Sequence, residues 1–346
     1  MSTDQISKDT QTDEHITLNR RNGKMKKLSL KVNSKSYVLK HFRKSLPTQT
    51  HEDECINSQL NNDEMKLAKI CSELCYYSYK LKKLGRWPEV IGDPVYVSRV
   101  SAVAKIPFYI SNSEKLNTIF ITCRGSYCFN DIITDITGNA LDFEADGETY
   151  KIHQGIYQTA SYIFYQSQPV IKKLNDNFPD RKIIITGHSL GASVASATTE
   201  MYYQSMPELN VRCICFAPPP SVDYMLWINS RLHTKTFIID GDFVPFLSVH
   251  NILKASNMIL NQKLFNIFKK IVFKTLKKRS LSELRDDIIM YPPGELYLFK
   301  LDEKRINVVE ILNPNYFSEI VNGLKETNHR FKNYVKVCNK FYIQNK

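Results

Sequence analysis

The stretch from Lys182 to Ala195 limits the possible folds of this chain more than any other. A β-branched apolar run ends abruptly at the pattern Gly-x-Ser-x-Gly, which occupies Gly187 to Gly191, and small residues follow. This order predicts a buried strand, a sharp turn with Ser189 at its apex and a closely packed helix. The flanking glycines fit because a side chain at either position would obstruct so tight a turn. The stretch therefore predicts a nucleophile elbow, the turn that presents a reactive serine.

A five-residue pattern also occurs by chance in ordinary strand-loop-helix units, so the rest of the chain must supply an acid and a base. In α/β-hydrolases these follow the serine in the order acid, then histidine. Asp242 comes directly after an apolar strand pattern, and Asp240 is a close competitor. We favour Asp242 because Gly241 before it and Val244-Pro245 after it predict a fixed turn that presents a carboxylate.

Only two histidines follow this acid in the chain, His250 and His329. His250 precedes the last strand-like segment, whereas the base is expected on a loop after the last strand, so His329 is the candidate. Two donors are needed to stabilise the oxyanion. We expect the backbone N–H of Leu190, which follows the nucleophile, and Ser126, which follows a buried strand pattern.

Strand and helix patterns alternate through the chain, which predicts an α/β-hydrolase fold with a mostly parallel central sheet, helices on both faces and a helical insert before the last strand. The stretch Thr137 to Tyr150 reads as an exposed acidic loop. Cys213 and Cys215 lie on a strand pattern and are expected to face opposite sides; the eight cysteines show no zinc-site spacing, and the chemistry requires no metal or cofactor. The predicted elements are a helix at 64–84, strands at 95–97, 106–110 and 118–122, a helix through 162–174, and strands at 182–186, 211–217, 236–239 and 295–299.

An ordered series of motifs resembles the class 3 lipase family, and within it the catalytic domain of sn-1-specific diacylglycerol lipases. The series runs from Ile121-Thr122-Cys123-Arg124-Gly125-Ser126 through His153-Gln154-Gly155-Ile156, Gly187-His188-Ser189-Leu190-Gly191 and Asp242-Phe243-Val244-Pro245 to His329. The resemblance implies a serine esterase acting on acylglycerols, with Ser189, Asp242 and His329 as its triad and Ser126 and Leu190 at the oxyanion hole. It also implies a lid over the serine near residues 137–150. The chain departs from the animal diacylglycerol lipases because its sequence has no membrane-spanning region.

The formal net charge of +12 indicates an anionic partner. One basic segment suggests that this partner is a membrane surface. Residues 261–279 have the pattern of a basic amphipathic helix without an acidic residue, typical of helices that lie in a membrane interface. The alternative is a helix that packs its apolar face on the core. We expect contact with an acidic membrane surface through this helix, with Lys263, Phe265, Phe268, Lys270, Lys274 and Lys277 as the binding residues.

The expected organisation is a polar, basic and partly disordered extension at 1–62, followed by a hydrolase domain at 63–346 with the amphipathic insert at about 251–290. A hairpin is expected inside the extension, at 28–42. No window has 18 consecutive apolar residues and the N-terminus has no apolar signal region, so we expect a cytoplasmic, peripherally membrane-associated protein. Nucleic acid is not an expected partner, because the basic tail has no recognition motif.

Two other functions fit the same sequence. A phospholipase A1 or broad acyl hydrolase would use the same triad, and only its substrate profile would differ. An inactive lipid-binding or scaffold protein belongs to another class, and the presence of all three triad residue types in order argues against it.

Overall fold

The computed structural model describes residues 55–57, 60–80, 87–126, 139–248, 250–251, 289–302, 305–321 and 323–346. The hairpin expected at 28–42 and nearly all of the amphipathic insert lie outside these residues. The predicted domain boundaries therefore stay predictions.

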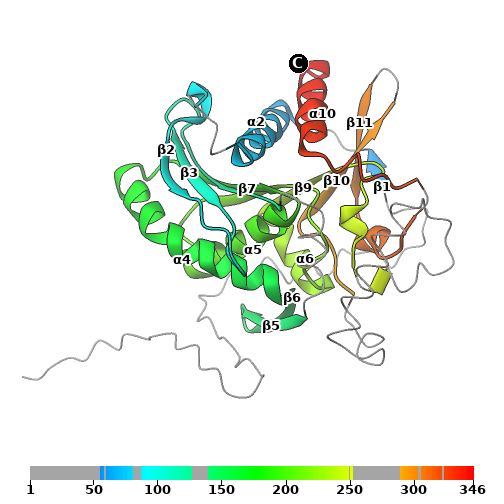
Figure 1. The fold of residues 1–346 in the computed structure, drawn as a ribbon, viewed down its shortest axis with the longest axis horizontal. Helices are drawn as coiled ribbons and strands as arrows, with labels where there is room; N and C mark the ends of the chain where they lie inside the picture. Colours follow the sequence, from blue (N-terminus) through cyan, green and yellow to red (C-terminus); the bar gives the residue numbers. More distant parts are fainter. Residues whose placement is uncertain are drawn as a thin grey trace, which may run out of the picture.

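A nine-stranded sheet forms the centre of the fold, in the order β1-β11-β10-β9-β8-β7-β4-β3-β2 (Figure 1). Its five inner strands are parallel, and the two outer strands on each side are antiparallel. The strands are β1 (Cys55–Asn57), β2 (Pro94–Ser98), β3 (Phe108–Ser113), β4 (Thr118–Cys123), β7 (Lys182–His188), β8 (Val211–Phe216), β9 (Thr234–Ile239), β10 (Glu295–Leu301) and β11 (Ile306–Ile311).

Helices cover both faces of this sheet and thereby bury the inner strands on both sides. In Figure 1, α2 and α10 lie above the sheet, and α4, α5 and α6 lie below it. Neighbouring residues of one strand serve the two cores: Ile119 and Ile121 of β4 pack with α4 and α5, and Phe120 between them packs with α2. The helices are α2 (Asn62–Ser78), α4 (Gln154–Asn177), α5 (Leu190–Ser205), α6 (Tyr224–Ser230) and α10 (Phe331–Gln344), with 3-10 turns η2 (Glu89–Ile91), η3 (Val244–Phe246) and η5 (Pro314–Phe317).

The predicted α/β-hydrolase architecture is confirmed, but the position of the insert relative to the sheet was wrong. The segment between β9 and β10 does not precede the last strand, since β11 follows and pairs with β10 antiparallel. Strand β11 has six residues without a clean alternation, since Ile306, Val308, Val309 and Ile311 are buried and only Asn307 is exposed. On its other side β11 pairs with β1, a strand contributed by the predicted N-terminal extension.

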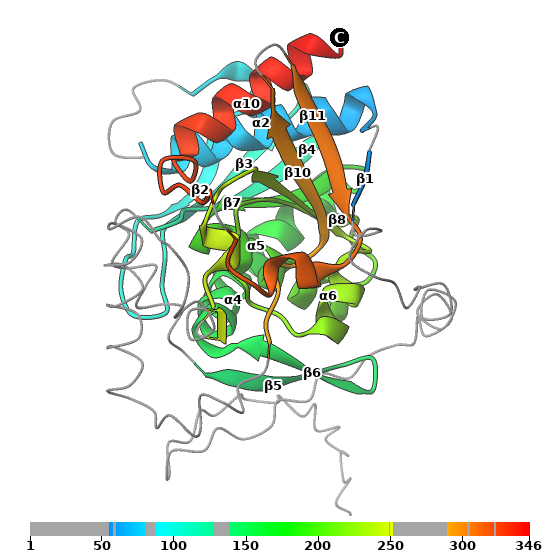
Figure 2. The ribbon, with the colours of Figure 1, turned by 90° about the vertical axis from the view of Figure 1, so that its right-hand side faces the viewer.

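The stretch expected to be an exposed acidic loop is a β-hairpin where the structure describes it. Strands β5 (Ala140–Ala145) and β6 (Glu148–His153) pair antiparallel around a turn at Asp146 and Gly147 (Figure 2). Acidic residues occupy the outward positions, while Phe143 and Tyr150 are buried against α4. The acidic composition concealed a period-two pattern whose apolar face packs on the core.

The expectation that Cys213 and Cys215 face opposite sides of their strand was also wrong. Residues two apart on a strand share a face, and the two sulfur atoms lie 3.3 Å apart on β8. Both are free, buried thiols, and burial raises the pKa of the Cys215 thiol well above its usual value.

Candidate active site

The nucleophile elbow is present between β7 and α5. Ser189 has φ +60° and ψ −132°, a left-handed conformation that a non-glycine residue rarely adopts. A Cβ at Gly187 would collide with the Gly191 carbonyl, and one at Gly191 would collide with the backbone of Cys123 and Gly125. The two glycines therefore let β4, β7 and α5 meet backbone to backbone directly beneath the serine.

The fold brings Ser189, His329 and Asp242 together from the ends of three different elements. His329 Nε2 lies 2.8 Å from Ser189 Oγ, and His329 Nδ1 lies 3.0 and 3.2 Å from the carboxylate oxygens of Asp242. The competing residues do not take part: Asp240 is exposed, and the hydrogen bonds to the acid and the serine both come from His329 rather than His250. The carboxylate is completely buried, so its interaction with the imidazole is not weakened by water.

Two further donors hold the Asp242 carboxylate in place. The Val244 N–H donates to Oδ1 at 3.0 Å, and the Tyr334 hydroxyl donates to Oδ2 at 2.6 Å. The same hydroxyl oxygen accepts the Ile239 N–H at 3.0 Å, so Tyr334 joins α10 to the end of β9. Burial and the adjacent Asp242 carboxylate raise the pKa of Tyr334 well above its usual value, which keeps the hydroxyl protonated as a donor.

A second histidine supports the first from below. His188 Nε2 lies 3.0 Å from the carbonyl oxygen of His329, and His188 Nδ1 lies 3.1 Å from the Tyr79 hydroxyl. A carbonyl only accepts, so Nε2 carries the proton and Nδ1 accepts from Tyr79. Burial, followed by the nearby His329, lowers the pKa of His188 well below its usual value. His188 is therefore a neutral imidazole that fixes the backbone of His329.

The two predicted oxyanion donors lie on neighbouring segments. Leu190 is the first residue of α5, so its N–H belongs to the amides that have no partner inside the helix and it lies at the positive end of the helix dipole. Ser126 follows β4, and the backbone of this segment at Gly125 abuts Gly191 on α5. This contact is consistent with the predicted role of Ser126, which stays a prediction.

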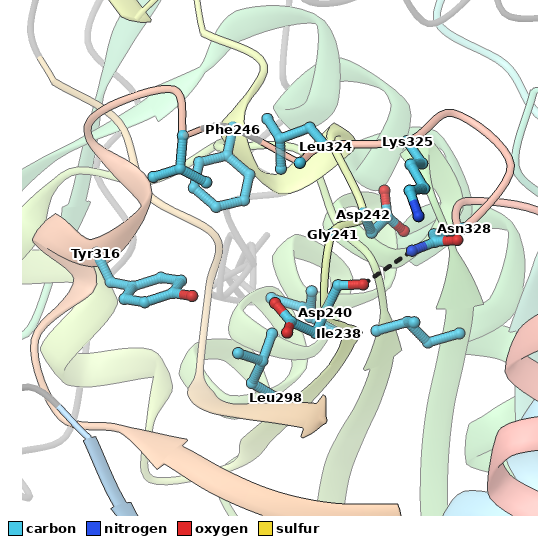
Figure 3. A pocket seen from close by; sticks show the side chains of 13 residues that line it. Ile238, Asp240, Gly241, Asp242, Phe246, Leu298, Tyr316, Leu324, Lys325 and Asn328 are labelled. Carbon is cyan, nitrogen blue, oxygen red and sulfur yellow. Dashed lines mark hydrogen bonds between the residues drawn. The ribbon is translucent and has the colours of Figure 1, made fainter. Parts of the chain in front are cut away.

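A pocket of about 260 Å³ lies next to Asp242, and Figure 3 shows the side chains that line it. Asp240, Gly241 and Asp242 form one wall, and Ser189 and His329 do not line it. The Asn328 side chain closes part of it by donating to the Asp240 carbonyl at 2.9 Å. The pocket is therefore not the place where a substrate would meet the nucleophile.

Other predicted site features fall where the structure gives no account. The membrane-binding candidates Lys263, Phe265, Phe268, Lys270, Lys274 and Lys277 lie outside the described residues. Among the helices that the structure describes, none combines the length and the apolarity needed to cross a bilayer. Within the same residues, His, Cys, Asp and Glu side chains do not form a group of three or more suited to a metal ion.

Sequence reasoning missed the residues that support the triad, Tyr334, Tyr79 and the role of His188. Tyr334 lies five positions after His329 on an unpredicted helix, and only that helix turns it back toward Asp242. His188 belongs to the Gly-x-Ser-x-Gly motif, and its position directly before Ser189 was the sequence signal that could have indicated its supporting role.

Comparison with known proteins adds a second line of evidence to this geometry. The family model described as lipase (class 3) matches residues 120–252, a range that contains β4, the elbow and Asp242. The resemblance to the class 3 lipases is confirmed. The match ends before His329, so the predicted role of this residue as the base is supported only by the hydrogen-bond geometry.

Individual relatives extend this similarity over part of the chain. Mouse diacylglycerol lipase-beta is 25% identical over 191 residues, which cover 54% of this chain and 28% of the relative. A Rhizopus niveus lipase is 32% identical over 140 residues, 40% of this chain and 33% of the relative. The chain thus spans about a third or less of these relatives' length. The solved Rhizomucor miehei triacylglyceride lipase has a TM-score of 0.59 at 16% identity, covers 82% of this chain and 99% of its own, and shares the fold.

Proposed function

We propose that this chain is a serine lipid esterase that hydrolyses acyl ester bonds of acylglycerols through an acyl-enzyme on Ser189. The observation that carries the proposal is the continuous hydrogen-bonded series from Ser189 Oγ through His329 to the buried Asp242 carboxylate. Three residue types in this geometry and chain order have one chemical use, the activation of a serine for acyl transfer.

The first half of the reaction forms the acyl-enzyme. His329 Nε2 takes the proton of Ser189 Oγ as this oxygen attacks the ester carbonyl carbon, and the carbonyl oxygen becomes negative. Asp242 stabilises the imidazolium that forms, and the Leu190 N–H with Ser126 donates to the oxyanion. When the tetrahedral intermediate collapses, the carbonyl re-forms, the bond to the alkoxy oxygen breaks, and His329 gives its proton to the leaving alcohol.

The second half repeats these steps with water as the nucleophile. His329 accepts a proton from water, the hydroxide oxygen attacks the acyl carbon, and Ser189 Oγ leaves with the proton returned by His329. The products are a fatty acid and the free enzyme. No cofactor takes part in any of these steps.

Diacylglycerol is the acylglycerol that we favour as substrate. Support comes from the relatives named diacylglycerol lipase-beta and -alpha and from the motifs shared with that group. The relatives named only as lipases support the wider acylglycerol class.

We further propose that the chain is cytoplasmic and works at an acidic membrane surface, which the basic insert contacts. The formal charge of +12 and the lysine-rich pattern of residues 261–279 support this. Deleting residues 261–279 should weaken binding to phosphatidylserine vesicles while hydrolysis of a soluble short-chain ester persists. Unchanged vesicle binding would refute the proposal that the insert contacts the membrane.

Hydrolysis of diacylglycerol, triacylglycerol and phospholipid by the wild type and Ser189→Ala tests the function. We expect diacylglycerol to be the fastest substrate and Ser189→Ala to be inactive on all three. A preference for the sn-1 ester of phospholipid would indicate a phospholipase A1 instead. Equal rates in the two proteins would refute the mechanism, and no hydrolysis by folded, lipid-bound wild type would indicate an inactive lipid-binding protein.

A further inference from the structure

The turn between β2 and β3 has a composition unlike that of an ordinary surface turn. Residues 99–105 read Arg-Val-Ser-Ala-Val-Ala-Lys, so an uncharged, largely apolar tip lies between two basic residues. Val103 is 95% exposed and Val100 46% exposed, and both flanking cations are exposed as well. A side chain as apolar as valine gains nothing from this degree of contact with water.

The backbone holds Val103 at the apex of the turn. The N–H and C=O groups of Ala102 and Lys105 bond to each other in both directions at 3.0 Å, which closes a two-residue turn. Ala104 has φ +53°, a left-handed conformation that such turns normally give to glycine or asparagine. Val103 and Ala104 thus occupy turn positions that favour polar residues or glycine. The exposure of Val103 shows that packing within the protein does not explain this choice.

The same turn lies on the edge of the sheet that carries the triad. Phe108, at the start of β3, pairs with Cys123 at the end of β4, and Cys123 pairs with Gly187 of β7. The carbonyl of Pro107 also accepts the backbone N–H of Arg124, which begins the predicted oxyanion segment, at 3.0 Å. The turn therefore extends beyond the edge at which Ser189 follows β7, and Figure 2 shows it in cyan, protruding at the left of the view.

We infer that residues 99–105, the β2–β3 tip, insert into the interface of an anionic lipid bilayer and orient the active-site edge toward it. The valines enter the boundary between headgroups and acyl chains, and Arg99 and Lys105 meet lipid phosphates and carboxylates. Charge complementarity supports this partner, because the whole hairpin from 94 to 113 has two basic and no acidic residues. The Lys105 ammonium lies over the Tyr162 ring on α4, 5.3 Å from its centre, and this contact positions the charge at the surface, where Lys105 is exposed.

This inference rests on the proposed function, since a lipid esterase must meet its substrate at a surface. It adds a second contact, placed on the described fold, to the one expected of the insert. Residues 99–105 contain no triad residue and neither of the predicted oxyanion donors, so the tip has no role in the chemical steps proposed above.

The test measures vesicle binding of the full chain carrying Ser189→Ala, so that no lipid is consumed. We expect Val100→Ser/Val103→Ser in this background to bind phosphatidylcholine/phosphatidylserine vesicles about tenfold more weakly. Arg99→Gln and Lys105→Gln should each weaken the same binding about fivefold, and should not change binding to phosphatidylcholine alone. Val95→Ser is the matched control, because Val95 is 50% exposed at the opposite end of β2, and its binding should match the parent.

Unchanged binding of the double valine variant, or an equal loss in Val95→Ser, would overturn the inference. With Ser189 restored, the double variant should hydrolyse a soluble short-chain ester within about twofold of wild type, since it leaves the triad intact. A larger loss would mean that the tip supports the site rather than the membrane contact. If the wild type proves inactive on every ester yet binds vesicles through the tip, the proposed function fails, and only the membrane contact of the tip is retained.

Discussion

The assignment of the acid can be tested with two substitutions two positions apart, Asp242→Asn and Asp240→Asn. The sequence left both aspartates open, whereas the structure gives only Asp242 contact with His329. Asparagine has the size of aspartate, so the change removes charge and one acceptor without opening a cavity.

The expected effect follows from the three donors around the carboxylate. Val244 N–H, the Tyr334 hydroxyl and His329 Nδ1 all direct a hydrogen at Asp242. A neutral amide has one acceptor oxygen, and its NH2 group then faces Tyr334 and His329. The His329 imidazole then accepts a hydrogen bond at Nδ1 and carries its own proton on Nε2. A protonated Nε2 can no longer take the proton of Ser189. The loss in kcat should be about 10³- to 10⁴-fold, equivalent to about 4 to 5.5 kcal/mol.

Hydrolysis of a soluble p-nitrophenyl ester measures this effect without a lipid surface, and circular dichroism checks that the variants are folded. Asp240→Asn should retain activity within about twofold, because its side chain is exposed and does not contact His329. Equal losses in the two variants, or a loss confined to Asp240→Asn, would refute the reasoning.

The supporting residues yield three more predictions. Tyr334→Phe removes the donor to Asp242 and leaves the buried Ile239 N–H without its acceptor, so chemical denaturation should show a loss of about 2 to 4 kcal/mol; a loss under about 0.5 kcal/mol would contradict this. Gly191→Ala forces a Cβ into the backbone of Cys123 and Gly125 and should reduce ester hydrolysis at least tenfold, whereas full activity would mean that the elbow tolerates bulk. Since the pKa of folded His188 is lowered, the unfolded chain binds the extra proton, and the free energy of unfolding should fall as pH drops below about 6.5, by up to about 1.4 kcal/mol per unit. His188→Gln should show a shallower slope in the same denaturation series, and an unchanged slope would exclude His188 as its source.

The centre of the fold was predictable because its residues combine strong local signals with burial on both faces. Strand β7 contains an uninterrupted β-branched run from Ile183 to Thr186, and Gly187 and Gly191 permit little besides an elbow. The assignment of Asp242 and His329 then followed from the chain order of α/β-hydrolases. The carboxyl ends of the parallel strands β7 and β9 bring Ser189 and Asp242 to one edge of the sheet, whereas His329 reaches that edge from the segment after the antiparallel strand β11.

Elements at the periphery of the fold were not predicted, because their local sequence signals were ambiguous. The acidic residues of β5 and β6 suggested a loop until pairing across the hairpin revealed one buried face. Strand β1 has three residues, and only β11 on the far edge of the sheet makes it a strand. Tyr334 could not be assigned either, because its contact with Asp242 spans 92 positions of the chain.

Covalent labelling by a fluorophosphonate probe tests the central claim most directly, because the probe reacts only with a serine that is activated for acyl transfer. Intact mass and peptide mapping should show one adduct on the wild type, located on Ser189, none on Ser189→Ala, and a much slower reaction of His329→Ala. A folded wild type that remains unlabelled, or an adduct that persists in Ser189→Ala, would contradict the account of Ser189 as the nucleophile.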